Sequence, residues 1–144
     1  MPDQAVSLRA HSVDAGANQA ISQRERNPIA AIAMDRALVD APCSGLGVLA
    51  ARPDLRWRAR PLPELQLGLL RAAAKRVRPG GTVVYAVCTL NVDENEAVVE
   101  ASGLEVLDLG SEWPRFRHPK RPEFVLTLPH RHGTSGFFVA RLRA

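Results

Sequence analysis

Two short apolar runs constrain the fold most, because each ends near a cysteine and a helical pattern lies between them. Residues 37–39 are Ala, Leu and Val and end at Asp40, with Cys43 three residues further on. Residues 82–87 form a β-rich apolar run that ends at Cys88. Such runs predict buried parallel strands, and strand, helix and strand in this order are typical of an α/β doubly wound sheet. Functional groups in these sheets gather beyond the carboxyl ends of parallel strands, so we expect both cysteines at one edge.

Other periodic patterns complete the expected arrangement. Residues 62–77 repeat apolar residues every three or four positions, which predicts a helix, and Pro63 suits its first turn. Residues 79–81, Pro-Gly-Gly, predict a turn that ends it. A second helix is predicted at about residues 92–101 and strands at residues 104–109 and 136–142. The predicted face of the first helix comprises Leu65, Leu69, Ala72, Ala73 and Arg76.

The chain divides into a leader and one folded domain. Residues 1–28 are mostly polar and small and show no period, so residues 1–34 are expected to be an atypical leader, either partly disordered or aberrant. Residues 35–144 are long enough for one domain with a hydrophobic core. The sequence contains no run of about 18 apolar residues that would predict a membrane span, and no apolar signal-peptide core. A cytoplasmic location is the default expectation.

The chain is basic, with a formal net charge of +4. This charge fits either the ordinary surface of a soluble protein or attraction to nucleic-acid phosphates. Two clusters favour the second reading, because Arg beside aromatic rings suits backbone contact with base stacking. One cluster, in the Gly-, Pro- and Arg-rich loop of residues 41–61, contains Arg52, Arg56, Trp57, Arg58 and Arg60. The other contains Arg115, Arg117, Lys120 and Arg121 beside Trp113 and Phe116.

Cys43 and Cys88 are the only cysteines. One pair is not a disulfide framework, and neither thiol has the neighbouring Cys or His of a structural zinc site, so no metal is expected. A free cysteine is ordinarily a small buried apolar residue, and the alternative is a reactive thiol. A thiol at a strand end that faces a helix N-terminus would have a lowered pKa, as a nucleophile requires. His118, His130 and His132 are expected on surface loops.

Three stretches carry a family resemblance. Residues 40–45 read Asp-Ala-Pro-Cys-Ser-Gly and continue with similar patterns at 46–48 and 52–57. Residues 78–85 are followed by Cys-Thr-Leu-Asn at 88–91 and Glu-Asn-Glu at 94–96, and a last stretch spans 132–142. In order, they resemble the motif IV region, the motif VI region and the C-terminal strand of the Sun/Fmu family. These are bacterial methyltransferases that make 5-methylcytosine in small-subunit ribosomal RNA from S-adenosylmethionine (SAM). The resemblance covers residues 35–143.

The resemblance implies a Rossmann-like SAM-dependent methyltransferase fold, of which this chain is the C-terminal half: a partial, mostly parallel sheet with flanking helices. It implies methylation of cytosine carbon 5 in RNA, 16S ribosomal RNA above all, with SAM as cofactor. Cys88 matches the nucleophile that adds to carbon 6, and Cys43 the residue that assists product release. Asp40 and Pro42 would form the substrate and cofactor edge. RNA would be contacted by Arg52, Arg56, Trp57 and Arg58.

The sequence also departs from the family pattern. Ala86 and Val87 precede Cys88 where the family usually has Ser-Thr, and Ser135 stands where Asp is common. No strand followed by a Gly-rich loop is recognisable before residue 35, so we expect the chain to lack the main SAM-binding motif and to be inactive alone. The alternatives are a non-catalytic RNA-binding remnant and a thiol redox protein. Asp40 can equally cap its own loop, and Glu94 and Glu96 can serve only their helix terminus.

Overall fold

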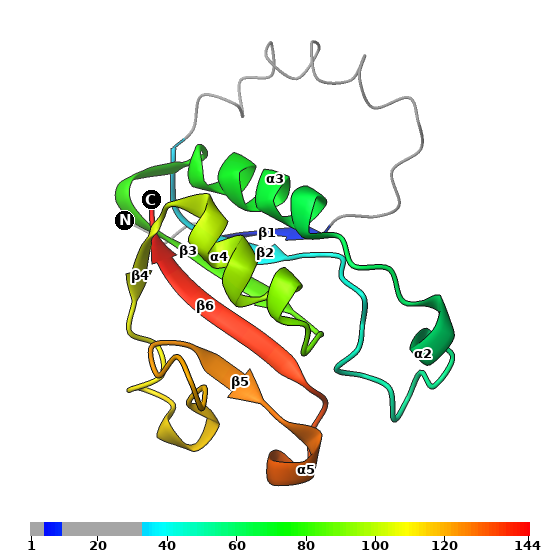
Figure 1. The fold of residues 1–144 in the computed structure, drawn as a ribbon. Coiled ribbons are helices and arrows are strands. Elements are labelled where there is room, and N and C mark those ends of the chain that lie inside the picture. The colour runs from blue at the N-terminus through cyan, green and yellow to red at the C-terminus, as the bar shows by residue number, and fades with distance from the viewer. Residues whose placement is uncertain (1–4, 10–32) are drawn as a thin grey trace, which may run out of the picture.

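One mixed sheet organises the structure. The computed structural model describes residues 5–9 and 33–144. In this part of the chain a six-stranded sheet has the order β1-β2-β3-β6-β4, and β5 also pairs with β6 (Figure 1). The strands are β1 (Ala5–Arg9), β2 (Met34–Asp40), β3 (Val77–Val87), β4 (Glu105–Leu107), β5 (Val125–Thr127) and β6 (Phe137–Arg143).

Strand direction changes across the sheet. β1, β2 and β3 are parallel, β6 is antiparallel to β3, and β4 and β5 are both antiparallel to β6. β4 pairs with residues 141–143 of β6 and β5 with residues 137–139, so these two short strands share one edge. The predicted strands at residues 37–39, 82–87, 104–109 and 136–142 are confirmed as β2, β3, β4 and β6.

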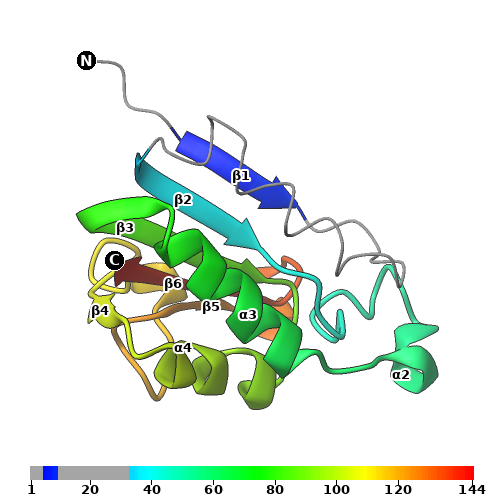
Figure 2. The same cartoon turned by 90° about the horizontal axis from the view of Figure 1, so that it is seen from above.

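Two helices cover one face of the sheet. α3 (Pro63–Ala74) and α4 (Glu96–Ser102) lie side by side on this face (Figure 2). The core between the layers includes Tyr85 of β3 and Phe138 and Leu142 of β6, packed with Leu70 and Val99 of the helices. The remaining helical turns are α2 (Leu55–Arg58), η2 (Val92–Glu94), which contacts α3 and α4, η3 (Pro114–Phe116) and α5 (Pro129–His132).

The predicted face of α3 is confirmed only in part, since Ala73 is buried and Leu69 packs against the core. Leu65 and Ala72 are exposed, whereas the buried positions are Gln66, Leu70 and Ala73. Gln66 lies on the buried face of the helix, where its side-chain amide donates hydrogen bonds to the Pro42 carbonyl oxygen and to Glu94. A pattern that scores only apolar residues excludes such a glutamine from the buried face.

Two further expectations about the strands need correction. Residues 79–81 are not a turn after α3 but an irregular part of β3, where the register with β2 shifts between Met34 and Arg36. Gly81 allows this close approach, since a Cβ there would lie 2.7 Å from the Asp35 carbonyl oxygen. β2 is buried on one face only, because Leu38 is 38% exposed while its neighbours Ala37 and Val39 are buried.

β1 lies within the segment that the sequence analysis assigned to a leader. It pairs with β2 from Ala5 opposite Arg36 to Arg9 opposite Asp40. No periodic pattern in residues 1–28 indicated a strand, because five residues at a sheet edge are too few to show a period. Residues 1–4 and 10–32 of the predicted leader lie outside the described residues.

His118 is buried and not on a surface loop as expected, with 6% of its surface exposed. Its Nδ1 accepts hydrogen bonds from the backbone N–H groups of Lys120 and Arg121, and its Nε2 lies 2.9 Å from Glu96 Oε1. Because Nδ1 acts as the acceptor, the neutral ring carries its proton on Nε2 and donates it to Glu96. Burial lowers the pKa of His118, which favours this neutral form.

The other two predicted surface histidines differ from each other. His130 is exposed, as expected, although it lies in α5. His132 is half-buried, accepts a hydrogen bond from the Leu128 N–H at its Nδ1, and packs edge-on against Phe116. The expectation for His132 is therefore corrected as well.

The buried His118 predicts a local stability effect. His118→Ala removes a hydrogen bond to a buried carboxylate and leaves two backbone N–H groups without their acceptor, so we expect a loss of about 2–3 kcal/mol in the free energy of unfolding. Urea denaturation followed by circular dichroism measures it. His130→Ala is the matched control and should change the free energy by less than about 0.5 kcal/mol. Equal effects of the two substitutions would contradict the role of the His118 bonds.

Candidate active site

The two cysteines meet at the carboxyl ends of two adjacent strands. β2 and β3 pair in parallel, with Asp40 opposite Ala86, so the segments that follow them leave the sheet at the same edge. The Sγ atoms of Cys43 and Cys88 lie 3.5 Å apart, and both thiols are free and half-buried. The expectation that both thiols share one edge of the sheet is confirmed.

The two thiols have different proton affinities. The hydrogen bond from Cys43 is the largest influence on Cys88 and lowers its pKa to about 7, while burial acts in the opposite direction. The same hydrogen bond, together with burial, raises the pKa of Cys43. Cys43 therefore keeps its proton and donates it toward a Cys88 thiolate. The main cause of the lowered pKa of Cys88 is therefore the Cys43 thiol, and not a helix N-terminus as expected.

The loop that carries Cys43 is attached to the strand end that carries Cys88. The Gly47 N–H donates to the Cys88 carbonyl oxygen at 3.0 Å, and the Gly136 N–H donates to the Gly47 carbonyl oxygen at 2.7 Å. A Cβ on Gly47 would lie 2.0 Å from the Gly136 carbonyl oxygen. Only glycine therefore fits between the Gly136 and Cys88 segments. The loop is therefore an ordered part of the site.

Side chains join the two cysteine-bearing turns as well. The hydroxyl oxygens of Ser44 and Thr89 lie 2.8 Å apart, and both residues are buried. The Asn95 side-chain amide donates to the Thr89 carbonyl oxygen, and the Asn91 N–H donates to the Thr89 hydroxyl. Residues directly after each cysteine are thus hydrogen-bonded to each other, which limits movement of one thiol relative to the other.

Glu94 is a site residue that the sequence analysis assigned only to a helix terminus. Its side chain is fully buried, and its Oε1 accepts hydrogen bonds from Ser44 N–H at 2.9 Å, Leu62 N–H at 3.1 Å and Gln66 Nε2 at 3.0 Å. An acidic residue before a helix is usually solvated, so the sequence pattern gives no sign of this burial. The one available signal was the position of Glu94 in the stretch that resembles motif VI. Glu96, assigned to the same terminus, contacts His118 instead.

Asp40 and Pro42 lie beside the thiols. Asp40 ends β2, is half-buried, and its charge raises the pKa of Cys88 as one of the weaker influences. Within the described residues its side chain makes no hydrogen bond to the loop, so capping of that loop finds no support. Pro42 directs its carbonyl oxygen to Gln66 Nε2 at 2.8 Å.

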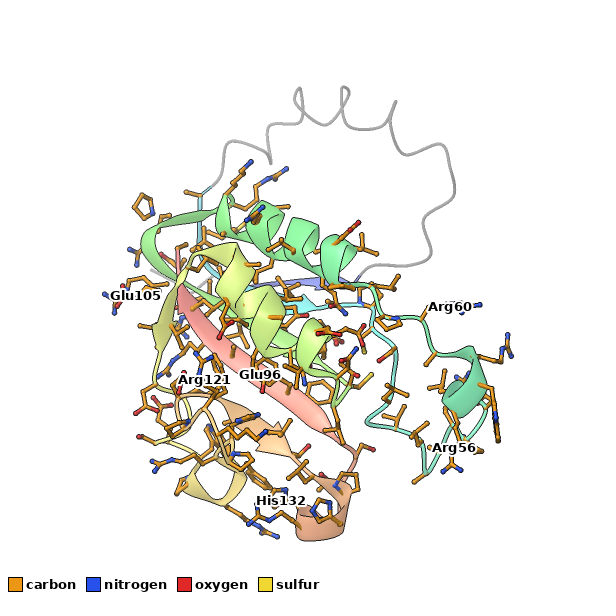
Figure 3. The ribbon with its side chains drawn as sticks, in the orientation of Figure 1. Arg56, Arg60, Glu96, Glu105, Arg121 and His132 are labelled. Carbon is orange, nitrogen blue, oxygen red and sulfur yellow. The ribbon has the colours of Figure 1, made fainter. Side chains whose placement is uncertain are left out.

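The first basic cluster lies on an arm that projects from the body of the structure (Figure 3). Trp57 is 78% exposed on α2, and the Arg56 guanidinium lies 5.9 Å from its ring centre. Asp54 partly neutralises the cluster: Arg52 donates to both its carboxylate oxygens at 2.9 and 3.0 Å, and Arg58 lies 3.9 Å away. The structure thus leaves an exposed indole with basic neighbours at the tip of the arm.

The second basic cluster is largely engaged within the protein. Arg121 pairs with Glu100 and with Glu123, and Arg117 donates to Ser111. Arg115 lies 5.4 Å from the ring centre of Phe116. Local acceptors therefore satisfy much of this cluster, and the arm of α2 is the stronger candidate for an RNA contact.

No group of three or more potential metal ligands occurs in the described residues. Among the helices of residues 33–144, none is long and apolar enough to cross a membrane.

The fold defines the class: the chain is a partial Rossmann-like fold of the SAM-dependent methyltransferase type, and solved structures agree. The structure of NSun6 from Pyrococcus horikoshii, solved with SFG, superposes with a TM-score of 0.61 at 36% identity, covering 78% of this chain and 30% of that one. A methyltransferase homologue from the same organism superposes with a TM-score of 0.62 at 28% identity, covering 85% of this chain and 41% of that one.

Residues 10–143 match the family model of the 16S rRNA methyltransferase RsmB/F, and the chain belongs to this family. This confirms the Sun/Fmu resemblance. The probable ribosomal RNA small subunit methyltransferase B of Synechocystis sp. is 46% identical over 121 residues, covering 76% of this chain and 27% of that protein. The ribosomal RNA small subunit methyltransferase F of Salmonella paratyphi B is 42% identical, with 76% and 25% covered. The chain thus spans about a quarter of these curated relatives.

Proposed function

We propose that this chain is the cysteine-bearing part of an enzyme that methylates carbon 5 of cytosine in RNA, with 16S ribosomal RNA as substrate and SAM as methyl donor. The observation that carries the proposal is the pair of thiols 3.5 Å apart, in which one has a pKa near 7 and the other keeps its proton. Cytosine carbon 5 is a weak nucleophile, so methylation there needs a thiolate that first adds to carbon 6. Cys88 supplies that thiolate at neutral pH.

The two thiols divide the reaction between them. The Cys88 sulfur forms a bond to carbon 6, which moves electron density to carbon 5 so that this carbon can be methylated. SAM, when bound, supplies the methyl group as an electrophile. The carbon 5 proton then leaves, its electron pair restores the ring double bond, and the bond from carbon 6 to Cys88 breaks.

Cys43 forms its thiolate, the base needed for this release, more readily once Cys88 is bound to the ring. Its hydrogen bond to Cys88 is the main cause of its raised pKa, and a Cys88 thioether carries no negative charge for it to stabilise. Loss of that partner lowers the pKa of Cys43, so that it releases its own proton to solvent and can then accept the carbon 5 proton as a thiolate. The coupling would therefore order the two steps, with attack by Cys88 first and release by Cys43 second.

Asp40 is the residue in this chain that fits a role beside SAM or the base. It stands half-buried at the end of β2, next to both thiols, and its carboxylate has no hydrogen-bond partner among the described residues. A carboxylate in that position can accept hydrogen bonds from an amino group of a ligand. A structural neighbour was solved with SFG, an analogue of SAM, which supports the choice of cofactor for the family.

The proposal is tested with a hybrid enzyme in which this chain replaces the matching segment of the Synechocystis relative. We expect the hybrid to form 5-methylcytosine in small-subunit ribosomal RNA, identified by mass spectrometry of nucleosides. A folded hybrid that binds RNA without methylating it would support a non-catalytic RNA-binding remnant. A hybrid that instead cycles its two thiols through a reversible disulfide would support a thiol redox protein.

The isolated chain is expected to bind RNA weakly and to show no SAM binding at micromolar concentrations by calorimetry. RNA contact through the arm of α2 involves few cations, so the affinity for labelled single-stranded RNA should fall with a log–log salt slope of about −1 to −2.

Trp57→Ala should cost about 1–3 kcal/mol of RNA-binding free energy through lost stacking. Trp113→Ala, at another exposed indole, is the control and should have little effect. Equal losses would move the RNA contact away from the arm. Micromolar SAM binding would refute the expectation that this chain lacks the main SAM-binding motif.

A further inference from the structure

Glu94 carries a buried negative charge that the thiol chemistry proposed above does not use. We infer that Glu94 is a positioning residue that holds the Cys43-bearing turn against Cys88. It does not touch the sulfur atoms through any hydrogen bond of the described residues, so it would act through the backbone around Cys43. The inference rests on the proposed function only for the role of Cys88 as nucleophile.

The hydrogen bonds of Glu94 reach both sides of Cys43. On one side, the Glu94 Oε1 accepts from the Ser44 N–H at 2.9 Å. On the other, Gln66 Nε2 donates both to Glu94 Oε1 at 3.0 Å and to the Pro42 carbonyl oxygen at 2.8 Å. The residues before and after Cys43 are therefore tied to one carboxylate, directly or through one amide.

Glu94 itself is held close to the second thiol. Its carbonyl oxygen accepts a hydrogen bond at 2.7 Å from the hydroxyl of Tyr85, which lies three residues before Cys88 in β3. Its Oε1 also accepts from the Leu62 N–H, which fixes the far end of the loop that contains Cys43. Glu94 thus joins three segments around the two sulfur atoms: its carboxylate contacts the loop and α3, and its backbone carbonyl contacts β3.

Burying a carboxylate costs solvation free energy. A buried Glu94 without a structural role is therefore a poor explanation. A carboxylate removed from water loses several kcal/mol of solvation unless hydrogen bonds replace it. Three N–H donors converge on Oε1 of Glu94, one more than its two lone-pair sites, while the buried Oε2 has no hydrogen-bond partner among the described residues. These donors lie 28 to 50 residues before Glu94 in the sequence, so the carboxylate organises tertiary structure at the thiols.

Glu94 affects the pKa of Cys88 in two opposite ways, through its hydrogen bonds and through its charge. The two effects can therefore be separated by experiment. As a clamp, Glu94 keeps Cys43 in hydrogen-bonding distance of Cys88, and that bond lowers the pKa of Cys88. As a charge, Glu94 raises the pKa of Cys88, more weakly. Loss of the clamp should therefore make Cys88 less acidic, whereas loss of the charge alone should not.

The experiment measures the reactivity of Cys88 in the 144-residue chain against pH. Iodoacetamide alkylation is quenched at intervals, and the Cys88 peptide is quantified by mass spectrometry. Glu94→Ala removes the acceptor, and the titration midpoint should rise by about one pH unit or more, which makes alkylation at pH 7 at least about fivefold slower. Glu94→Gln keeps an oxygen that can accept the same three N–H groups and removes the charge. Its midpoint should stay at or below that of the unchanged chain.

Two further variants keep the test decisive. Glu96→Ala removes the neighbouring carboxylate, which binds His118 and not the cysteine-bearing turns, so it should destabilise the fold without moving the Cys88 midpoint. If Glu94→Ala does not fold, Gln66→Leu decides, because it removes the donor to Pro42 and Glu94 at similar volume and should raise the midpoint. A folded Glu94→Ala, or in its place Gln66→Leu, with an unchanged midpoint overturns the inference. This readout needs no methylation, so it can fail or succeed independently of the proposed nucleophile.

Discussion

Cys88→Ala is expected to reduce methylation by the hybrid enzyme on the order of a thousandfold or more, because it removes the thiolate that is proposed to add to carbon 6 of cytosine. The same variant should form no covalent adduct with RNA that contains 5-fluorocytosine. Fluorine at carbon 5 cannot leave as a proton does, so the intermediate would be trapped in the enzyme that still has Cys88. The adduct is measured by denaturing gel electrophoresis with labelled RNA.

Cys43→Ala provides the comparison within the same site. It leaves Cys88 in place, so attack on carbon 6 continues while release is impaired, and an adduct with ordinary RNA should accumulate. If Cys88→Ala kept normal turnover, the assignment of the two thiols would be wrong. If Cys43→Ala and Cys88→Ala behaved alike, with neither adduct nor product, separate roles for attack and release would lose their support.

The second large effect is on the pH dependence of Cys88. Its reactive form is the thiolate, so reactivity is present above its pKa and lost as the pH falls through about 7. Cys43→Ala removes the hydrogen bond that lowers this pKa most, and the midpoint of Cys88 alkylation should rise toward the ordinary thiol value of about 8.5. At pH 7 the alkylation rate should then fall by about tenfold or more.

Cys43→Ser separates the hydrogen bond from the second sulfur. A serine hydroxyl can still donate to the Cys88 thiolate, so its midpoint should lie between those of the unchanged chain and Cys43→Ala. A midpoint near 7 in Cys43→Ala would mean that another group sets the acidity of Cys88. Agreement of the Cys43→Ala and Glu94→Ala midpoints would show that the buried carboxylate acts on Cys88 through Cys43.

The order and periodicity of local patterns were enough to place the two thiols. Apolar runs identified β2 and β3, and the intervening helix made a parallel arrangement the natural one. Parallel neighbours end at the same sheet edge, so Cys43 and Cys88 were expected together before any contact was known. The separation of 3.5 Å and the difference in proton affinity between the thiols could not be obtained in this way. Both depend on how the loop after β2 closes over the end of β3.

The sequence by itself determined four of the six described strands, the main helix, the meeting of the thiols and the family to which the chain belongs. These follow from local periods and short motifs, which are properties of neighbouring residues. Only the tertiary structure decided which polar residues are buried. Glu94, Gln66 and His118 look solvated in any local pattern, and each is buried because its partners come from distant segments. A polar group can be buried only where distant segments of the chain supply its hydrogen-bond partners. A local sequence pattern does not contain that information.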